Sequence, residues 1–547
     1  MTHRRQSRWL VVVLVAVLCL PPLSLGGAPL AAGAADSRMV SLAEAVPADA
    51  WFFAAMTLDR SGSQAVLADQ LLDRTGIGRL IDQSMATDPS WAQTERDLVA
   101  YDAFLHRDMA VFVTPQAIAG QLNAATSTPA AGAGLIVRVA DPVAAASLMA
   151  SVGANAAGRV VHGAVAVNVE PPSTSSTGSA WALLGDLVVV GIAPEDVFGV
   201  IDVVRGGAPS LAARPAFGAA TAVLPSTLLA AGFYDVGPLR EQIADIAAAS
   251  APGLEDQELA ALDLMLPLGA RGGFGLWADP AGFRLAFTTS PATGERGSRP
   301  VGADLASAAS VLMITGHDLG KNPVWRGWLA AADRYAAAFG NSNFASELPT
   351  RLGFDPIDDL LARLTGDWVV TGVPQFLATP PIAFTLVSGT DDPARLASTL
   401  DTIAGLLIEQ AKTPSSQIEA AAVVRAGQSI HRVAFPFDNE TGSVAIEYGV
   451  VGDRVAVTVG RPLDAALRPP AQPLTTNPRY QTAMAMLPPD RSTEAFVDLA
   501  PLLPMASRVM AAGGMSLPTG LRADGFAMVA TVRDGVLVTE AVLTIPE

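Results

Sequence analysis

The tripeptide His106-Arg107-Asp108 has the residue types of a protein-kinase catalytic loop. In that loop the aspartate accepts the proton of the substrate hydroxyl, and an asparagine five residues later holds magnesium. Here Val113 stands at the asparagine position, and the sequence has no glycine-rich phosphate loop. We therefore interpret the tripeptide as a turn that precedes a buried strand.

Histidine side chains offer metal ligands or proton-transfer groups, and four follow the first 35 residues: His106, His162, His317 and His431. No two of them lie three or four residues apart, the spacing that places two metal ligands on one helix face. His162 and His431 instead lie near the starts of expected strands. We predict no metal site, and a site that folding assembles from distant residues is the alternative.

Neighbouring carboxylates can catalyse glycoside hydrolysis or bind calcium. Such pairs stand at Glu255-Asp256, Asp358-Asp359 and Asp391-Asp392, each beside an expected helix start or in a polar loop. Because carboxylates stabilise helix N-termini, we interpret these pairs as capping residues.

Two further motifs of catalysis and cofactor binding are incomplete or absent. The sequence has no Gly-x-Ser-x-Gly nucleophile motif, and Thr75-Gly76-Ile77-Gly78 lacks the third glycine of a dinucleotide site. The sequence therefore assigns no catalytic, cofactor-binding or metal-binding residue. It predicts a protein that uses no cofactor and is not an enzyme.

The N-terminus has the pattern of an export signal. Three arginines within the first eight residues precede an apolar run from Trp9 to Leu20, and small residues follow at Ala31–Ala35. This pattern predicts a signal peptide over residues 1–35 and a secreted or extracytoplasmic protein of the cell envelope. An uncleaved N-terminal anchor is the alternative. No later apolar run is long enough to predict a transmembrane span.

Net charge limits the possible partners of the protein, and cysteine content limits its disulfides and metal sites. Without the three arginines of the predicted signal, 32 basic residues stand against 52 acidic ones, a net charge of −20. Such a surface repels phosphate backbones, so the sequence predicts no nucleic-acid partner. The one cysteine, Cys19, lies in the predicted signal, which excludes disulfides and cysteine-based metal sites from the mature chain.

Two stretches of the chain resemble each other. Ten of thirty positions are identical between Ser210–Leu239 and Pro473–Leu502, without a gap. Other landmarks recur at offsets that differ by a few residues, among them Gly185-Asp186 and Gly452-Asp453. Since insertions in loops produce such drift, we predict a tandem duplication.

Each predicted copy contains strands joined by tight turns and a helix that begins at an Asp-Pro pair, Asp141-Pro142 or Asp392-Pro393. Tight turns join antiparallel strands, so the predicted fold class is α+β. We expect one antiparallel sheet per copy, with helices packed on one face and a separate hydrophobic core. The predicted boundaries are 36–290 for the first repeat, 291–301 for a polar linker and 302–547 for the second repeat.

Several of these landmarks together resemble a bacterial family catalogued as domain of unknown function 3352. They are Val46–Ala50, Ala140–Pro142, Leu184–Asp186, Leu224-Pro225 and Phe233–Val236. The resemblance covers nearly all of the mature chain. It implies an exported protein of uncharacterised function and supplies no catalytic residues.

The predicted duplication and export, together with the lack of a recognisable catalytic, metal or cofactor motif, favour a non-enzymatic extracytoplasmic binding or envelope-assembly protein. Two similar units that face each other form a cleft, and ligands favour such interfaces. The expected partner is an unknown envelope protein, a peptide or an apolar ligand. A structural envelope spacer is one alternative. The other is a carboxylate-dependent hydrolase that acts on glycan or peptide.

Overall fold

The computed structural model describes most of the chain from residue 37 to residue 547. The described ranges are 37–59, 61–87, 108–117, 131–153, 158–170, 178–250, 271–290, 299–321, 329–330, 332–334, 336–337, 344–375, 380–411, 419–425, 427–436, 443–464, 468–512, 520–533 and 536–547. The predicted signal peptide lies outside them, as do His106, Glu255-Asp256 and residues 291–298 of the predicted linker.

We refer to the described residues up to 290 as the first half and those from 299 onward as the second half. The strands of the first half are β1 (Phe52–Thr57), β2 (Asp108–Val113), β3 (Ala133–Arg138), β4 (Gly158–His162), β5 (Val165–Glu170), β6 (Ser179–Leu184), β7 (Leu187–Gly191), β8 (Ala230–Asp235), β9 (Arg271–Asp279) and β10 (Gly282–Thr289). Its helices are α2 (Ser37–Leu42), α3 (Ser63–Thr75), α4 (Ile77–Thr87), α7 (Pro142–Gly153), α8 (Pro194–Val204), η2 (Leu211–Ala213), α9 (Pro215–Thr221) and α10 (Val236–Ser250).

The strands of the second half are β11 (Leu312–His317), β12 (Leu364–Pro374), β13 (Ile382–Thr390), β14 (Glu419–Arg425), β15 (Gln428–Pro436), β16 (Ser443–Val451), β17 (Arg454–Val459), β18 (Thr493–Asp498), β19 (Gly525–Arg533) and β20 (Val536–Thr544). Its helices are α12 (Gly302–Leu305), η3 (Leu319–Lys321), α14 (Phe344–Leu352), η4 (Pro356–Leu360), η5 (Leu361–Arg363), α15 (Pro393–Ala411), η6 (Leu474–Thr476), α17 (Pro478–Ala485) and α18 (Leu499–Ala512). No helix in this described part of the chain is both long and apolar enough to cross a membrane.

The strands pair in the same order in both halves, antiparallel throughout. The first half runs β4-β5-β6-β7-β3-β2-β1-β8-β9-β10. The second half runs β14-β15-β16-β17-β13-β12-β11-β18-β19-β20. Positions in one half can therefore be matched to positions in the other by strand register.

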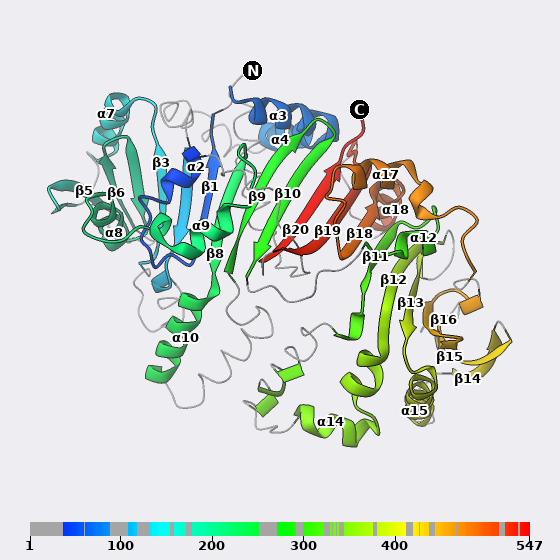
Figure 1. Ribbon diagram of the computed structural model, residues 1–547. Coiled ribbons are helices and arrows are strands. Elements are labelled where there is room, and N and C mark those ends of the chain that lie inside the picture. Colours follow the sequence, from blue (N-terminus) through cyan, green and yellow to red (C-terminus); the bar gives the residue numbers. More distant parts are fainter. Residues whose placement is uncertain are drawn as a thin grey trace.

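The expectation of two separate sheets is wrong, because all twenty strands belong to one sheet (Figure 1). Strand β10 pairs with β20 over the whole of Gly282–Thr289 and so joins the two halves. Each of these strands is the outer member of a hairpin and would otherwise leave a row of N–H and C=O groups without partners. At this junction Arg284 forms an ion pair with the buried carboxylate of Glu540, at 3.1 Å.

Helices cover both faces of the sheet, which corrects the expected packing on one face. On one side, called the pocket face below, α2, α8 and α9 cover Phe53 and Phe112 in the first half, and α12 and α17 cover Met313 and Phe496 in the second. On the opposite face, α3 and α7 pack in the first half and α15 packs in the second. Hydrophobic spacing identifies the apolar side of a helix, but it does not indicate which sheet face that side will cover.

The predicted turns and helix starts are confirmed. Gly185 and Gly452 both have φ of +64° and form the turns that join β6 to β7 and β16 to β17. Glycine reaches this left-handed conformation without the steric cost that a side chain brings. Asp141 and Asp392 accept hydrogen bonds from backbone N–H groups in the first turns of α7 and α15.

Candidate functional site

The three histidines that the structure describes each contact a different aspartate. The N···O pairs are His162–Asp202 at 2.7 Å, His317–Asp367 at 2.6 Å and His431–Asp401 at 2.8 Å. The histidines belong to β4, β11 and β15. Within the described ranges, no three His, Cys, Asp or Glu side chains are grouped so that they could hold a metal ion. The three histidines therefore do not form a shared site.

The described acidic pairs take part in local structure. Asp359 accepts a hydrogen bond from the Asp355 N–H at 2.8 Å and forms an ion pair with Arg395. In the pair Asp391-Asp392, Asp392 caps the start of α15, and Asp391 lies 4.0 Å from Arg363. The contact of Asp392 agrees with the interpretation as capping residues, whereas Asp359 and Asp391 pair with arginines.

Asp108 of the kinase-like tripeptide and Gly76 of the incomplete dinucleotide motif both belong to secondary-structure elements of the fold. Asp108 is buried at the start of β2, which confirms the interpretation of a buried strand at this place. Gly76 ends α3 with φ of +77°, and α4 begins at the next residue. The Gly76 segment joins two helices and so lacks the strand-loop-helix arrangement that binds phosphates.

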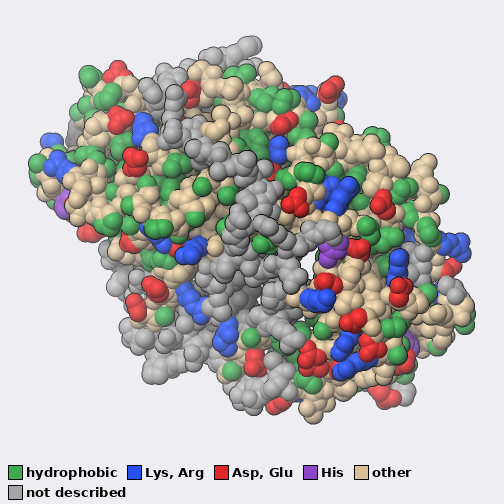
Figure 2. Space-filling view, in the orientation of Figure 1, with side chains coloured by type: hydrophobic (Ala, Val, Ile, Leu, Met, Phe, Trp, Pro, Cys, Tyr) green, Lys and Arg blue, Asp and Glu red, His purple; other side chains and the backbone are tan. Residues whose placement is uncertain are grey.

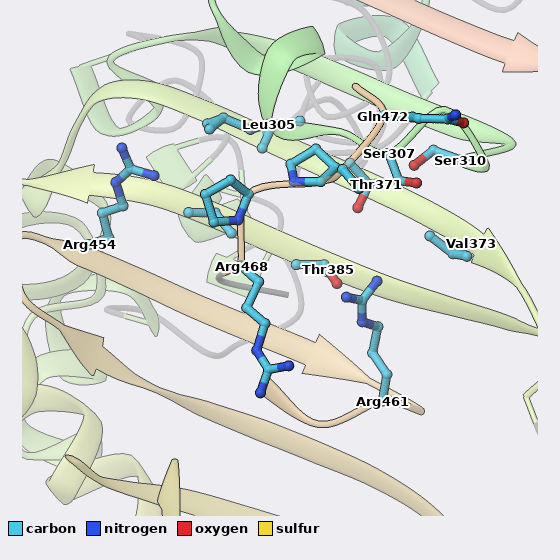
Figure 3. A pocket seen from close by; sticks show the side chains of 15 residues that line it. Leu305, Ser307, Ser310, Thr371, Val373, Thr385, Arg454, Arg461, Arg468 and Gln472 are labelled. Carbon is cyan, nitrogen blue, oxygen red and sulfur yellow. The ribbon is translucent and has the colours of Figure 1, made fainter. Parts of the chain in front are cut away.

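A cavity of about 460 Å³ opens on the pocket face of the second half, within residues 305–472. This volume lies in the range of small-molecule sites. Residues of β12 and β13 form its floor, and the segment that follows β17 forms a wall (Figure 3). The cavity therefore lies within the second half and not in a cleft between the two halves.

Among the described residues that line this pocket, the charged ones are Arg454, Arg461 and Arg468, and none is Asp or Glu. Arg468 is largely exposed and pairs with Asp464 at 3.3 Å. The chain as a whole has 52 acidic residues against 35 basic ones, and both kinds are mixed over the face that Figure 2 shows. Burial lowers the pKa of the Arg461 guanidinium, which stays charged because arginine begins from a very high value. The described lining therefore carries positive charge in a chain whose net charge is negative.

Two hydroxyl groups on residues that line the pocket are buried without a hydrogen-bond partner in the described part of the chain. They are Ser310 Oγ and Thr385 Oγ1, on residues that are 1% and 4% exposed. A buried hydroxyl without a partner costs roughly 1–3 kcal/mol on the scale of protein mutations. A ligand with hydrogen-bonding atoms would remove this cost, so the two hydroxyls favour a binding role for the cavity.

The strand register determines the order of side chains along the pocket floor. Thr371, Thr385 and Thr458 lie directly opposite one another on β12, β13 and β17. Val369 and Val387 form the neighbouring row on the same face, because side chains alternate along a strand. The floor therefore combines an apolar row with a row of hydroxyls.

The segment that carries Arg461 is held by buried polar contacts. Thr458 Oγ1 donates to the Arg461 carbonyl at 2.8 Å, and the Leu463 N–H donates to Glu447 Oε2 at 2.8 Å. Glu447 is 3% exposed and accepts two hydrogen bonds from Arg425. Burial alone would raise the pKa of Glu447, but the bonds from Arg425 and Leu463 outweigh it and keep the pKa below its ordinary value. The ionised carboxylate therefore fixes the wall of the pocket at neutral pH.

The first half has no such cavity at the matching place of its described sheet. At the register positions of Thr371, Thr385 and Thr458 it has Phe112, Gly134 and Gly191. A Cβ atom on Gly134 would lie 2.5 Å from the Phe112 ring, so the ring fills the space above this glycine. Helix α8 follows β7 and buries Val197 and Ile201 in the same core cluster as Phe112. Aromatic and aliphatic side chains thus occupy the volume that is open in the second half.

Comparison with known proteins places this architecture in a family. The family model described as protein of unknown function (DUF3352) matches residues 10–522. The chain belongs to this family. No curated protein and no solved structure matches it. The membership confirms the predicted resemblance, and the family description gives no activity that could be assigned to the pocket.

The sequence predictions assigned no residue to this pocket. Its arginines lie at positions 454, 461 and 468, and its floor threonines lie on the consecutive strands β12 and β13 and on β17, which four further elements separate from β13. The sequence did contain one signal. The strands of the pocket floor have threonines at positions where the matching strands of the first half have phenylalanine and glycine. That signal becomes visible only when the strand register is known.

Proposed function

We propose that the protein is a non-enzymatic binding protein for a small organic anion, held in the basic pocket of the second half. The observation that carries the proposal is the described lining, in which three arginines stand beside two buried hydroxyls without partners and no carboxylate is present. Carboxylate and phosphate groups both suit this lining, because arginine binds either through paired N–H groups. Leu305 and Val369 provide apolar surface for the organic part.

The same lining argues against the hydrolase alternative at this place. Glycoside hydrolysis needs two carboxyl groups that flank the scissile bond. Here the charged residues of the pocket are arginines, and the acidic pairs Asp358-Asp359 and Asp391-Asp392 make contacts outside it. Binding without turnover therefore agrees better with the residues present.

We include export in the proposal. The basic residues, apolar run and small residues of positions 1–35 support an extracytoplasmic location. The mass of the mature chain recovered from native cells tests this part, because retention of residues 1–35 in a cytoplasmic fraction would contradict it.

Isothermal titration calorimetry with octanoate, octyl phosphate and neutral octanamide tests the binding function. We expect the two anions to bind and octanamide to bind far more weakly. Arg461→Gln should weaken anion binding about tenfold or more, since a hydrogen bond to a charged group contributes about 1.5–3 kcal/mol. Arg351→Gln is the matched control, because Arg351 is exposed on α14 and pairs with Glu347 outside the pocket. Equal binding of all three compounds, or equal losses in both variants, would contradict the proposal.

Thr385→Val should separate stability from binding. Valine has nearly the shape of threonine, and it removes a buried hydroxyl that has no partner. We expect the free energy of unfolding to stay equal or to rise by about 1 kcal/mol, because the cost of the unsatisfied group disappears. Affinity for octyl phosphate should fall several-fold in the same variant. Urea unfolding and calorimetry measure the two quantities, and a loss of stability without a loss of affinity would contradict a ligand-binding role for this hydroxyl.

A further inference from the structure

We propose that the ligand of this pocket is an elongated dianion, with two anionic groups separated by a mainly apolar chain. This inference depends on the proposed binding function and specifies its ligand class. It starts from the positions of Arg454 and Arg461, which bind opposite ends of the ligand. The chemistry fits a long dicarboxylate or a related molecule with an anionic group at each end.

The two arginines lie at opposite ends of one strand. Arg454 is the first residue of β17, and Arg461 stands two residues after its last residue, Val459. At about 3.3 Å per residue, the strand itself is about 16 Å long, and Gly460, with φ of +78°, turns the chain before Arg461. Figure 3 shows Arg454 and Arg461 on opposite sides of the pocket, with Arg468 between them. The guanidinium groups therefore do not converge on one point, as a site for a compact monoanion would require.

The floor between the two arginines is apolar with a single polar row. Starting from Arg454, the strand register gives Val369 with Val387, then Thr371 with Thr385, and then Val373. Side chains two residues apart point to the same face, so these rows follow one another along the strands. A ligand that lies along β17 would pass over apolar surface, meet the hydroxyls near its middle and end beside Arg461.

The end of the pocket near Arg461 also carries the second unpartnered hydroxyl. Ser310 precedes β11, and the N–H of the next residue, Val311, donates to the Gly372 carbonyl at 2.8 Å. Ser310 thus lies near the part of β12 that carries Val373, which also lines the pocket. At this level of the sheet the cavity has Arg461 on the β17 side and the Ser310 hydroxyl on the β11 side, whereas no such buried hydroxyl stands at the Arg454 end of the described lining.

A dianion of matching length binds an arginine with each of its two anionic groups, whereas a monoanion binds an arginine with only one. Once one end is bound, the second arginine meets a group that is already held nearby, which raises the effective concentration. A chain that is too short cannot span the two sites and loses this gain. Affinity should therefore depend on ligand length and not only on ligand charge.

Calorimetric titration with α,ω-dicarboxylates from adipate to tetradecanedioate tests this, with monocarboxylates of the same chain lengths in parallel at constant ionic strength. We expect one range of dicarboxylate lengths to bind at least about tenfold more tightly than the matched monocarboxylates, in agreement with one additional charged contact. In Arg454→Gln the ratio of the two affinities should fall close to one. In the control Arg351→Gln the ratio should stay that of the unmodified protein.

The outcomes distinguish this inference from the binding function itself. Monocarboxylates that bind as tightly as dicarboxylates at every length would overturn the dianion inference and leave anion binding intact. If neither series binds, anion binding fails as well. A ratio that Arg454→Gln leaves unchanged would show that the second charge is recognised elsewhere, and this too would overturn the inference.

Discussion

Glu494→Ala should lower the free energy of unfolding by about 3–5 kcal/mol, the loss expected when one partner of a buried ion pair is removed. Glu494 lies on β18 and is completely buried. Its carboxylate accepts hydrogen bonds from Arg491, which is 4% exposed, from the Tyr480 hydroxyl at 2.7 Å and from Arg299 at 3.2 Å. Alanine would leave the Arg491 guanidinium buried without this acceptor.

Urea unfolding followed by circular dichroism measures this loss, and Glu347→Ala provides the matched control. Glu347 pairs with Arg351 on the exposed surface of α14, where an ion pair contributes about 1 kcal/mol or less. Glu494→Gln is a milder variant that keeps an acceptor oxygen and should lose less stability than alanine. Equal losses for Glu494→Ala and Glu347→Ala would mean that the buried cluster does not stabilise the fold.

Phe112→Ala should also lower the free energy of unfolding by about 3–5 kcal/mol, because it removes a buried aromatic ring and leaves a cavity. Phe112 is 1% exposed and fills the space above Gly134 in the first half. The matching residue in the second half is Thr371, which lines the open pocket. Thr371→Ala should cost less than about 1 kcal/mol, because it deletes few contacts next to an existing cavity.

The comparison of these two variants tests whether the halves have different roles. A large loss for Phe112→Ala and a small one for Thr371→Ala agrees with packing at this place in the first half and an open pocket at the matching place in the second half. Thr371→Ala should in turn weaken octyl phosphate binding, which Phe112→Ala should leave unchanged if the variant is folded. Similar losses of stability at both positions would contradict the difference between the halves.

The candidate site could not be found from sequence patterns because its parts are separated by more than 150 residues. Leu305 and Arg461 line one cavity only because β11, β12, β13 and β17 are neighbours in the sheet. The histidines and acidic pairs that the structure describes, which sequence patterns make conspicuous, form ion pairs and helix caps. Arginine and threonine have no characteristic spacing, so the pocket residues gave no motif.

The sequence by itself determined the local structure of this protein. Glycine at positions 185 and 452 gives a turn because φ of +64° costs it little, and an aspartate before proline starts a helix at 141 and 392. Such features depend on residues that are adjacent in the chain. Family membership followed from the same landmarks.

Only the tertiary structure decided how the halves combine and where a ligand would bind. The pairing of β10 with β20 joins two strand edges that are more than 240 residues apart, and any exposed edge offers the same N–H and C=O groups. The cavity likewise lies at the place in the second half where the first half buries Phe112 beside α8. Backbone edges and packing volumes are properties of assembled elements, so no local pattern of residues specifies them.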